Sequence, residues 1–147
     1  MSLSTNYLNQ WCEKNIKRNR FMGVFAINQL PYIQSYLRPC GLIVNTDSAN
    51  LPGEHWIAVI LNICGRGEIF DSFGELPPSE LAIWMNKHCF RGWTYSRNRI
   101  QNIYSNLCGA YCLFYLYQRL NRERSPLYIF KRLDVMSDYS LHEFSEM

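Results

Sequence analysis

Cys108 is the first residue whose type and position suggest chemistry, because it opens an apolar run that extends to Leu120. A thiol attacks a carbonyl carbon as its thiolate, so a catalytic cysteine needs surroundings that favour the anion. The start of a helix offers such surroundings, since its first backbone N–H groups are unpaired and the helix dipole is positive there. Gly109 follows directly and leaves room for a substrate backbone to approach. Taken alone, Cys108 would more often be a small buried hydrophobic residue.

Two side chains on a neighbouring hairpin could serve this thiol. His55 opens an apolar strand, which places its imidazole at the edge of the core, where it could act as a base. Asp71 lies on the returning strand, and its carboxylate could accept an imidazole N–H and orient the ring. The register is open: a turn centred near Ile63 sets His55 opposite Asp71, whereas a turn at 65–66 offsets them. Considered alone, His55 could also be a hydrogen-bonded structural histidine, and Asp71 a surface charge on the hairpin.

Gln101 adds a possible oxyanion donor, in a polar segment shortly before Cys108. Its carboxamide could act together with the backbone N–H of Cys108, a type of contact worth ~3 kcal/mol in other enzymes. Trp56, next to His55, could pack beside the catalytic ring or could equally be a core aromatic. We therefore expect four catalytic or oxyanion residues, with Trp56 and Gly109 as candidates for substrate binding.

The elements that must position these side chains follow from the apolar pattern. Residues 56–61 are continuously apolar and too short for a typical helix, which predicts a central strand covered on both faces. Two glycines near 65–67 indicate a turn, after which residues 68–73 return as the partner strand of a hairpin. Residues 108–120 contain no helix breaker after Gly109 and predict a buried helix.

The other segments are expected to surround this core. Helical spacing of apolar residues predicts a first helix within residues 1–20, and residues 21–39 are interrupted by Gly23, Pro31 and Pro39. Periodicity and breakers predict the remaining elements: at most one short helix at 32–37, a strand at 41–45, a surface helix capped by Ser79 and ending before Gly92, a strand at 93–103, and one or two outer helices in 126–147.

Length and composition predict one globular domain over residues 1–147. Hydrophobic residues make up 48% of the chain, which excludes intrinsic disorder. Neither a membrane span nor a secretory signal is apparent, so we expect an intracellular protein with its six cysteines reduced. The net charge of +3 permits a nucleic-acid partner without requiring one.

Together these residues carry a family resemblance. Glu-His-Trp at 54–56, Phe-Asp-Ser-Phe-Gly at 70–74, Gln101 and Cys-Gly at 108–109 resemble, in order and spacing, the adenovirus maturation proteases. They are more distantly similar to the proteases that remove SUMO-like modifiers. Segments 21–25 and 40–46 extend the resemblance, which covers roughly residues 21–116.

The resemblance implies a papain-like α+β fold with a permuted His, Asp, Cys order and a central mixed or antiparallel sheet flanked by helices. The nucleophile would lie at the N-terminus of a buried helix. It implies a monomeric cysteine endopeptidase that cleaves viral or mobile-element structural precursors, such as capsid or core proteins, through a thioester. The enzyme would need no cofactor for its chemistry and would act in the host nucleus or cytoplasm and in the virion.

The chain also departs from the adenovirus enzymes, which are longer at the C-terminus and use a disulfide-linked activating peptide, with DNA as a second activator. Cys89 lies one residue from the position of the cysteine that binds this peptide cofactor in the adenovirus enzymes. A buried thiol is therefore the better interpretation of Cys89, and the sequence identifies no cofactor-binding residue. Basic groups that could contact nucleic acid, although solvated helix faces explain them better, are Lys14, Lys17, Arg18, Arg20, Arg119, Arg122 and Arg124.

Two other functions stay open on the sequence. One is an isopeptidase that removes ubiquitin-like modifiers, with the same four residues. The other is a non-catalytic domain in which Cys108 and Cys112, one helical turn apart, bind zinc structurally with His55 or Cys89. The spacing of the first two lacks the usual paired-cysteine knuckle, so our interpretation assigns no metal site.

Overall fold

A five-stranded mixed sheet forms the centre of the computed structural model, which describes residues 3–33, 35–46, 55–101 and 106–147. The strands follow one another across the sheet in chain order: β1 (Phe21–Ala26), β2 (Cys40–Asn45), β3 (Trp56–Leu61), β4 (Gly67–Phe70) and β5 (Trp93–Tyr95). The two outer pairs are parallel and the two inner pairs antiparallel. The predicted α+β class with a helix-flanked mixed sheet is confirmed.

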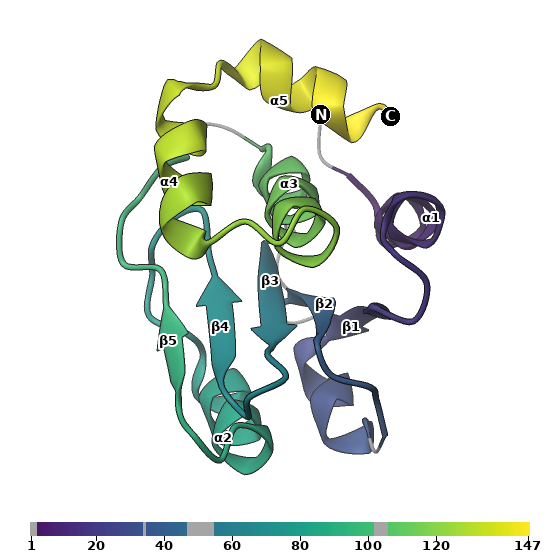
Figure 1. Ribbon diagram of the computed structural model, residues 1–147, viewed down its shortest axis with the longest axis vertical. Coiled ribbons are helices and arrows are strands. Elements are labelled where there is room, and N and C mark those ends of the chain that lie inside the picture. The colour runs from purple at the N-terminus through teal and green to yellow at the C-terminus, as the bar shows by residue number, and fades with distance from the viewer. Residues whose placement is uncertain (1–2, 34, 47–54, 102–105) are drawn as a thin grey trace.

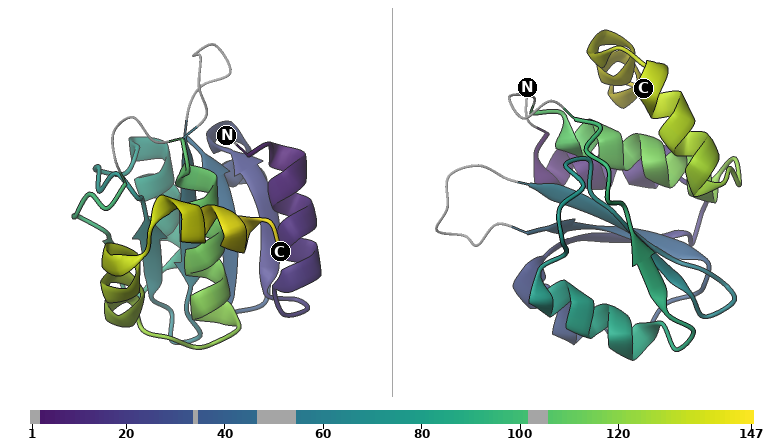
Figure 2. Two further views of the ribbon diagram at one scale, coloured as in Figure 1. Left: turned by 90° about the horizontal axis from the view of Figure 1, so that it is seen from above. Right: turned by 90° about the vertical axis from the view of Figure 1, so that its left-hand side faces the viewer.

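Helices cover both faces of the sheet. The helical elements are α1 (Thr5–Asn15), the 3-10 helix η1 (Ile27–Tyr32), α2 (Ser79–His88), α3 (Cys108–Leu120), α4 (Pro126–Val135) and α5 (Asp138–Ser145). Figure 1 shows α3 over one end of the central strands, and the right-hand view of Figure 2 shows the sheet between a layer with α1 and α3 and a layer with α2 and η1. Helices α4 and α5 lie outside α3.

The central strand β3 is buried along its whole length, as its apolar sequence predicts. Trp56, Ala58 and Ile60 belong to the hydrophobic cluster under α3. The alternate residues Ile57 and Val59 face the second cluster, under α2, because successive strand residues point to opposite faces. Burial of each such aliphatic side chain stabilises the fold by ~1.5–3 kcal/mol. Strand β3 is therefore held firmly in the core, which fixes the position of the residue that precedes it, His55.

The β3–β4 hairpin settles the register that the sequence left open. Ala58 pairs with Phe70, so continuing the same register sets Asp71 opposite Ile57 and two residues from the position opposite His55. The observed register lies between the two that we considered. His55 and Asp71 are therefore diagonal neighbours, and diagonal pairs are within reach of long side chains.

Helix α3 is the most buried helix of the described chain, as predicted. It packs closely on β2, since a side-chain carbon added at Gly41 would lie 2.7 Å from a methyl group of Leu116. At its C-terminal end, Arg119 donates to Glu68 of β4 through Nε at 2.9 Å, and Nη2 lies 2.5 Å from the other carboxylate oxygen. The hydroxyl of Tyr115 donates to the same carboxylate at 2.7 Å. This network fixes α3 to the strand that leads to Asp71.

Several predicted boundaries are wrong. Residues 21–26 form the edge strand β1, where we expected an irregular connection, because pairing with β2 tolerates the irregularity at Gly23, whose φ is 140°. The short helix is η1, at 27–32 instead of 32–37. Helix α2 has Pro78 at its N-cap, so Ser79 does not cap it. The strand expected at 93–103 ends at Tyr95, and residues 102–103 lie outside the described chain.

Two global features can be checked on the described residues. All six cysteines are free, as predicted. In the part of the chain that the structure describes, no helix has the length and apolar character needed to cross a membrane. The single domain over 1–147 stays a prediction.

Candidate active site

The antiparallel hairpin brings His55 and Asp71 to one end of the sheet. His55 directly precedes β3 and Asp71 directly follows β4, and Figure 1 shows the start of β3 and the end of β4 on the same side, beneath α3. Nε2 of His55 lies 2.8 Å from Oδ1 of Asp71, a hydrogen bond in which the imidazole donates. The side chain of Asp71 is 3% exposed and that of His55 17%, so the pair is shielded from water.

The Asp71 carboxylate is fixed by its own turn. Oδ1 also accepts the backbone N–H of Phe73 at 2.8 Å. The backbone N–H of Asp71 donates to the hydroxyl of Ser96, which donates in turn to the Asp71 carbonyl. Gly74 closes the turn by donating to the same carbonyl at 2.9 Å, and its φ of 68° suits glycine. The carboxylate therefore has little freedom to leave the imidazole.

The other ring nitrogen of His55, Nδ1, has different surroundings. Nδ1 is buried and has no hydrogen bond of ordinary geometry to any described residue. Burial alone lowers the pKa of His55, but hydrogen bonding to Asp71 and to Cys108, with the charges of both groups, outweighs it and raises the pKa to about 10. The Cys108 thiol is therefore near enough to the imidazole to raise its pKa.

Cys108 is the first residue of α3, and the N-cap position before it is Leu107, whose side chain makes no capping hydrogen bond. Three other helices each begin after a serine whose hydroxyl accepts a backbone N–H of the first turn: Ser4 for α1, Ser125 for α4 and Ser137 for α5. The N-terminus of α3 thus keeps the positive end of its dipole without a side-chain cap, which favours an anion there. The site residue Cys108 is 4% exposed.

Four of the other thiols have a different character. Burial raises the pKa of Cys12, of Cys112 and of Cys89, and it raises the pKa of Cys40 to about 11. Such thiols stay protonated and unreactive near neutrality. Cys89 is 3% exposed at the end of α2, which confirms the buried-thiol interpretation.

Gln101 is anchored to the residue after Asp71. Its backbone N–H donates to the carbonyl of Ser72 at 3.0 Å, beside the N–H of Ile100 at 2.9 Å. The hydroxyl of Ser72 donates to Oε1 of the Gln101 carboxamide. Both side chains are 1% exposed. The turn that carries Asp71 therefore also holds Gln101.

An aromatic ring packs against the imidazole. The ring of Phe73 lies 4.9 Å from that of His55, centre to centre, at 31°. The guanidinium of Arg99 lies over the same phenyl ring at 5.9 Å. Phe73 thus contacts His55 with its side chain and holds Asp71 with its backbone, which limits the movement of both.

The two residues expected to bind substrate have other surroundings. Trp56 is 1% exposed and its indole N–H donates to the carbonyl of Leu3 at 3.2 Å, so it offers a substrate no surface and belongs to the core. A side-chain carbon at Gly109 would lie 3.3 Å from Cβ of Leu3 and 3.4 Å from Leu8. The missing side chain makes room for the N-terminal segment, and a contact of Gly109 with substrate stays a prediction.

The sequence analysis missed three residues that hold the site: Ser72, Phe73 and Ser96. The first two stand beside Asp71 in the Phe-Asp-Ser-Phe-Gly motif, so their position was a usable signal. Ser96 lies 25 residues further on, and nothing in its local pattern marks it.

Among the basic residues that could contact nucleic acid or form solvated helix faces, Arg119 has a different role. Arg119 is paired with Glu68 inside the protein, with 16% of its side chain exposed, so it is a structural residue. The zinc hypothesis also lacks support, since the described residues contain no group of three or more His, Cys, Asp or Glu side chains that could hold a metal ion.

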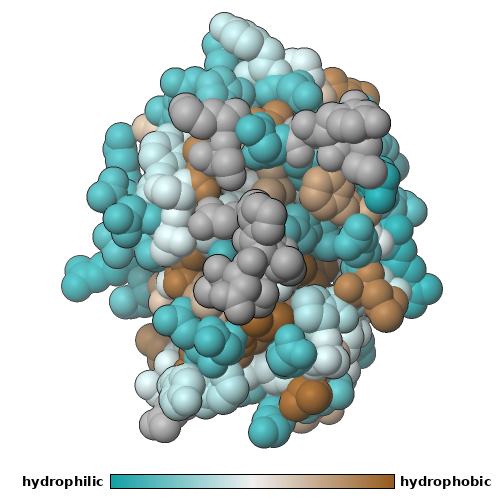
Figure 3. Space-filling model, turned by 180° about the vertical axis from the view of Figure 1, so that it is seen from behind, coloured by the Kyte–Doolittle hydropathy of each residue, from teal (hydrophilic) through white to brown (hydrophobic). Residues whose placement is uncertain are grey.

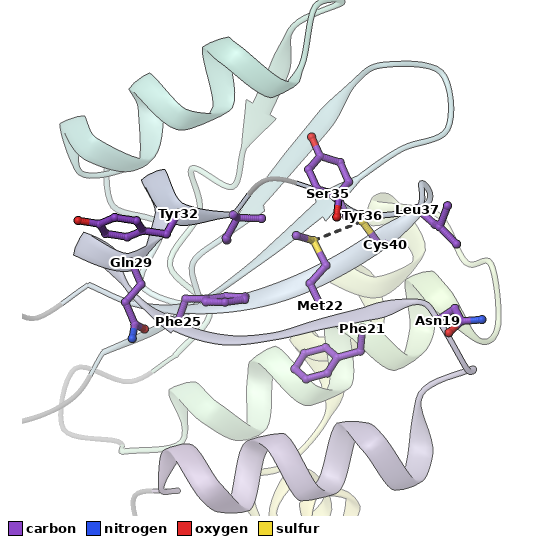
Figure 4. Close-up of a pocket in the computed structure, with 11 residues that line it drawn as sticks. Asn19, Phe21, Met22, Phe25, Gln29, Tyr32, Ser35, Tyr36, Leu37 and Cys40 are labelled. Atoms are coloured by element: carbon purple, nitrogen blue, oxygen red, sulfur yellow. Dashed lines mark hydrogen bonds between the residues drawn. The ribbon is translucent and has the colours of Figure 1, made fainter.

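A cavity of about 640 Å³ lies away from the candidate site, between β1 and η1. Figure 4 shows Phe25 and Tyr32 along its wall, with the thiol of Cys40 3.5 Å from the sulfur of Met22. None of the four predicted catalytic or oxyanion residues lines it. Figure 3, which shows the back of the molecule, has apolar residues scattered among mostly hydrophilic ones.

Comparisons with known proteins relate this chain to viral cysteine proteases. No family model matches the chain. A "Cysteine protease" of African swine fever virus (a Tick/Malawi isolate) is 28% identical over 138 residues, which cover 82% of this chain and 49% of the relative. Its counterpart from a Tick/South Africa isolate, at the same identity and coverage, carries the name "SUMO-1 cysteine protease". The chain spans about half the length of these curated relatives.

Solved structures show the same fold. A crystal structure of the African swine fever virus protease aligns with 98% of this chain and 66% of its own, with a TM-score of 0.70 and 20% identity. The central domain of an uncharacterised Legionella pneumophila protein aligns with a TM-score of 0.60 and 11% identity, over 99% of this chain and 94% of its own. The chain is thus similar in sequence to viral cysteine proteases and similar in fold to one of them, which supports the predicted enzyme class.

Proposed function

We propose that this chain is a cysteine peptidase in which Cys108 is the nucleophile, His55 transfers the proton and Asp71 orients His55. Gln101 and the backbone N–H of Cys108 bind the oxyanion. The observation that carries the proposal is an imidazole that is hydrogen-bonded to a buried carboxylate and whose pKa is also raised by Cys108, the first residue of a buried helix. The chain order His, Asp, Cys is the permuted order that the family resemblance implies for a papain-like site.

The resting state follows from the pKa of His55. A pKa of about 10 means that the ring is an imidazolium at neutral pH, with one N–H donated to Asp71. The natural counter-ion for its second N–H is the Cys108 thiolate, which the N-terminus of α3 also favours. In this proposal the nucleophile attacks as the thiolate, and the proton needed by the leaving group resides on the ring.

Each step of the reaction balances with these groups. The Cys108 thiolate attacks the scissile carbonyl carbon, and the carbonyl electrons move to oxygen, where Gln101 and the backbone N–H stabilise the negative charge. The tetrahedral adduct collapses to a thioester as the imidazolium gives its proton to the departing amine. Neutral His55 then takes a proton from water, whose oxygen attacks the thioester and releases the acid and the thiolate. The chemistry needs no cofactor.

The substrate class of this proposal is a polypeptide precursor of a virus particle or mobile element, such as a capsid or core protein. Support comes from the viral relatives named as cysteine proteases and from the family resemblance of the site. Such a protease would act in the infected cell and in the particle. Monomeric state, activation by a peptide and contact with nucleic acid stay predictions.

An isopeptidase acting on a ubiquitin-like modifier is the second candidate, because several viral relatives carry "SUMO-1" in their names. It uses the same chemistry at an amide of a lysine side chain. The two candidates differ in what the protein must hold, an extended peptide or a folded modifier.

The first test maps thiol reactivity. Dilute iodoacetamide at pH 6 should label Cys108 first, because an ordinary thiol is almost fully protonated there. Cys64, the exposed cysteine, is the matched control, since it is accessible but has no imidazole partner among the described residues. Preferential labelling of Cys64 at pH 6, or equal labelling in His55→Ala, would contradict the proposed ion pair.

The second test separates the candidate substrates. Wild type and Cys108→Ala are incubated with a precursor polypeptide and, separately, with a SUMO-1 vinyl sulfone probe. Cleavage of the precursor by wild type alone supports the endopeptidase, and covalent capture of the probe by wild type alone supports the isopeptidase. Undiminished cleavage by Cys108→Ala would sink both.

A further inference from the structure

Ser72 lies between two residues of the candidate site and is buried, with 1% of its surface exposed. Asp71 before it binds His55, and Phe73 after it packs on the same ring. The Ser72 hydroxyl donates to the carboxamide of Gln101, 29 residues away in the chain. We propose that Ser72 is the positioning residue that orients the Gln101 carboxamide toward the oxyanion, an inference that rests on the proposed function.

The two ends of a carboxamide differ in their hydrogen-bonding chemistry. Oε1 only accepts hydrogen bonds, whereas the NH₂ group only donates. An oxyanion needs a donor, and an acceptor turned toward it would repel the negative charge. Because the Ser72 hydroxyl donates to Oε1, the opposite end of the carboxamide is the NH₂ group, the end that can donate to an oxyanion. The hydroxyl thus selects the productive one of two orientations of nearly equal shape.

Burial makes this selection energetically significant. With the hydroxyl removed, Oε1 of Gln101 would lose that hydrogen bond inside the protein, and a buried acceptor without a partner is unfavourable. Rotation of the carboxamide toward another donor is the simplest relief, and it would turn the NH₂ group away from its productive direction.

Two other contacts of Ser72 make the hydroxyl separable from the backbone. The Ser72 carbonyl accepts the N–H groups of Ile100 and Gln101, at 2.9 and 3.0 Å. These bonds survive in Ser72→Ala. The substitution therefore leaves the Gln101 backbone in place and tests the carboxamide orientation alone.

The expected effect can be bounded. Loss of a whole oxyanion donor lowers kcat ~100- to 1,000-fold. Ser72→Ala leaves the donor present but misdirected for part of the time, so we expect a kcat roughly 10-fold lower with KM unchanged within about 2-fold. The rate of Cys108 alkylation should stay at the wild-type value, because the thiolate and its imidazolium do not depend on Gln101.

A double-mutant cycle provides the decisive measurement. Peptide-cleavage kinetics are compared for wild type, Ser72→Ala, Gln101→Ala and the double variant. If Ser72 acts through Gln101, Ser72→Ala costs nothing further once Gln101 is alanine. Ser72→Thr, which keeps the hydroxyl, should restore at least part of the lost kcat.

Ser145 provides a matched control for a purely structural serine. It is also 1% exposed, and its hydroxyl donates to the His142 carbonyl at 2.7 Å on α5. Ser145→Ala should lower the free energy of unfolding by a similar amount and leave kcat unchanged.

Four results would overturn the inference: wild-type kcat in Ser72→Ala, an equal loss with Gln101 already replaced, a parallel loss of Cys108 alkylation, or wild-type kcat in Gln101→Ala. Failure of the proposed function itself would look different, since Cys108→Ala would then keep its activity.

Discussion

The substitution Asp71→Asn tests what makes His55 an imidazolium. It keeps the shape of the side chain, and an oxygen that can still accept the imidazole N–H, but it removes the negative charge. The hydrogen bond to the ionised Asp71 carboxylate is the largest of the effects that raise the pKa of His55, and the charge of Asp71 adds to it; a neutral amide oxygen accepts a weaker bond and carries no charge. We therefore expect the pKa of His55 to fall on the order of 2 pH units in this variant.

The free energy at stake follows from the wild-type value. A rise from the ordinary 6.5 to about 10 corresponds to roughly 5 kcal/mol of preference for the charged ring, at about 1.4 kcal/mol per pH unit. Asp71 and Cys108 together produce this preference for the charged ring, and they do so against burial, which lowers the pKa of His55. Cys108→Ala should therefore also lower the pKa of His55, and the double variant should bring it below 6.5, because burial then acts alone.

The same shift predicts how stability depends on pH. The pKa is higher in the folded protein than in the unfolded chain, so the stabilising contribution is fully present below about pH 6.5 and is lost as pH rises through about 10. The difference in unfolding free energy between wild type and Asp71→Asn should thus be greatest below the pKa of His55 in the variant and shrink as pH rises from there toward about 10. A difference that grows with pH would have the wrong sign.

Nuclear magnetic resonance of the histidine ring protons provides the assay, with chemical shifts followed from pH 5 to 11. His88 is the internal control, because its pKa is lowered by burial and by Arg38 and Lys87, far from the substitution. Its titration should be the same in both proteins. If His55 titrates at the same pH in wild type and Asp71→Asn, the role assigned to the carboxylate is refuted.

Two further predictions concern the framework of the site. Gly74→Ala should lower the free energy of unfolding by about 2 kcal/mol or more and also reduce kcat, because φ is 68° and the new carbon would lie 2.6 Å from the backbone of Asn98; wild-type urea unfolding would show that the turn adapts without strain. Glu68→Gln should destabilise the protein by roughly 2 kcal/mol, since it leaves Arg119 partly buried without its counter-charge. An unfolding midpoint in urea equal to that of wild type, at both low and high salt, would rule this out.

Local pattern was sufficient to predict the central elements. The apolar run that became β3 and the unbroken run of α3 each carry their own signal, because a fully buried element needs apolar residues on every side. The glycines between β3 and β4 likewise identified the hairpin. The edge strand β1 was not predictable in this way, since half-exposed residues around Gly23 acquire their strand structure from pairing with β2.

The sequence by itself determined which residue types are available and which elements carry them: a thiol at a helix start, an imidazole before a strand and a carboxylate after its partner. Only the tertiary structure decided that they meet. The hairpin register fixed His55 beside Asp71, the packing of α3 on the sheet brought Cys108 near enough to raise the pKa of that imidazole, and a hydrogen bond across 29 residues joined Ser72 to Gln101. Periodicity reports how a segment folds on itself, whereas distances between segments are set by how their buried faces fit together.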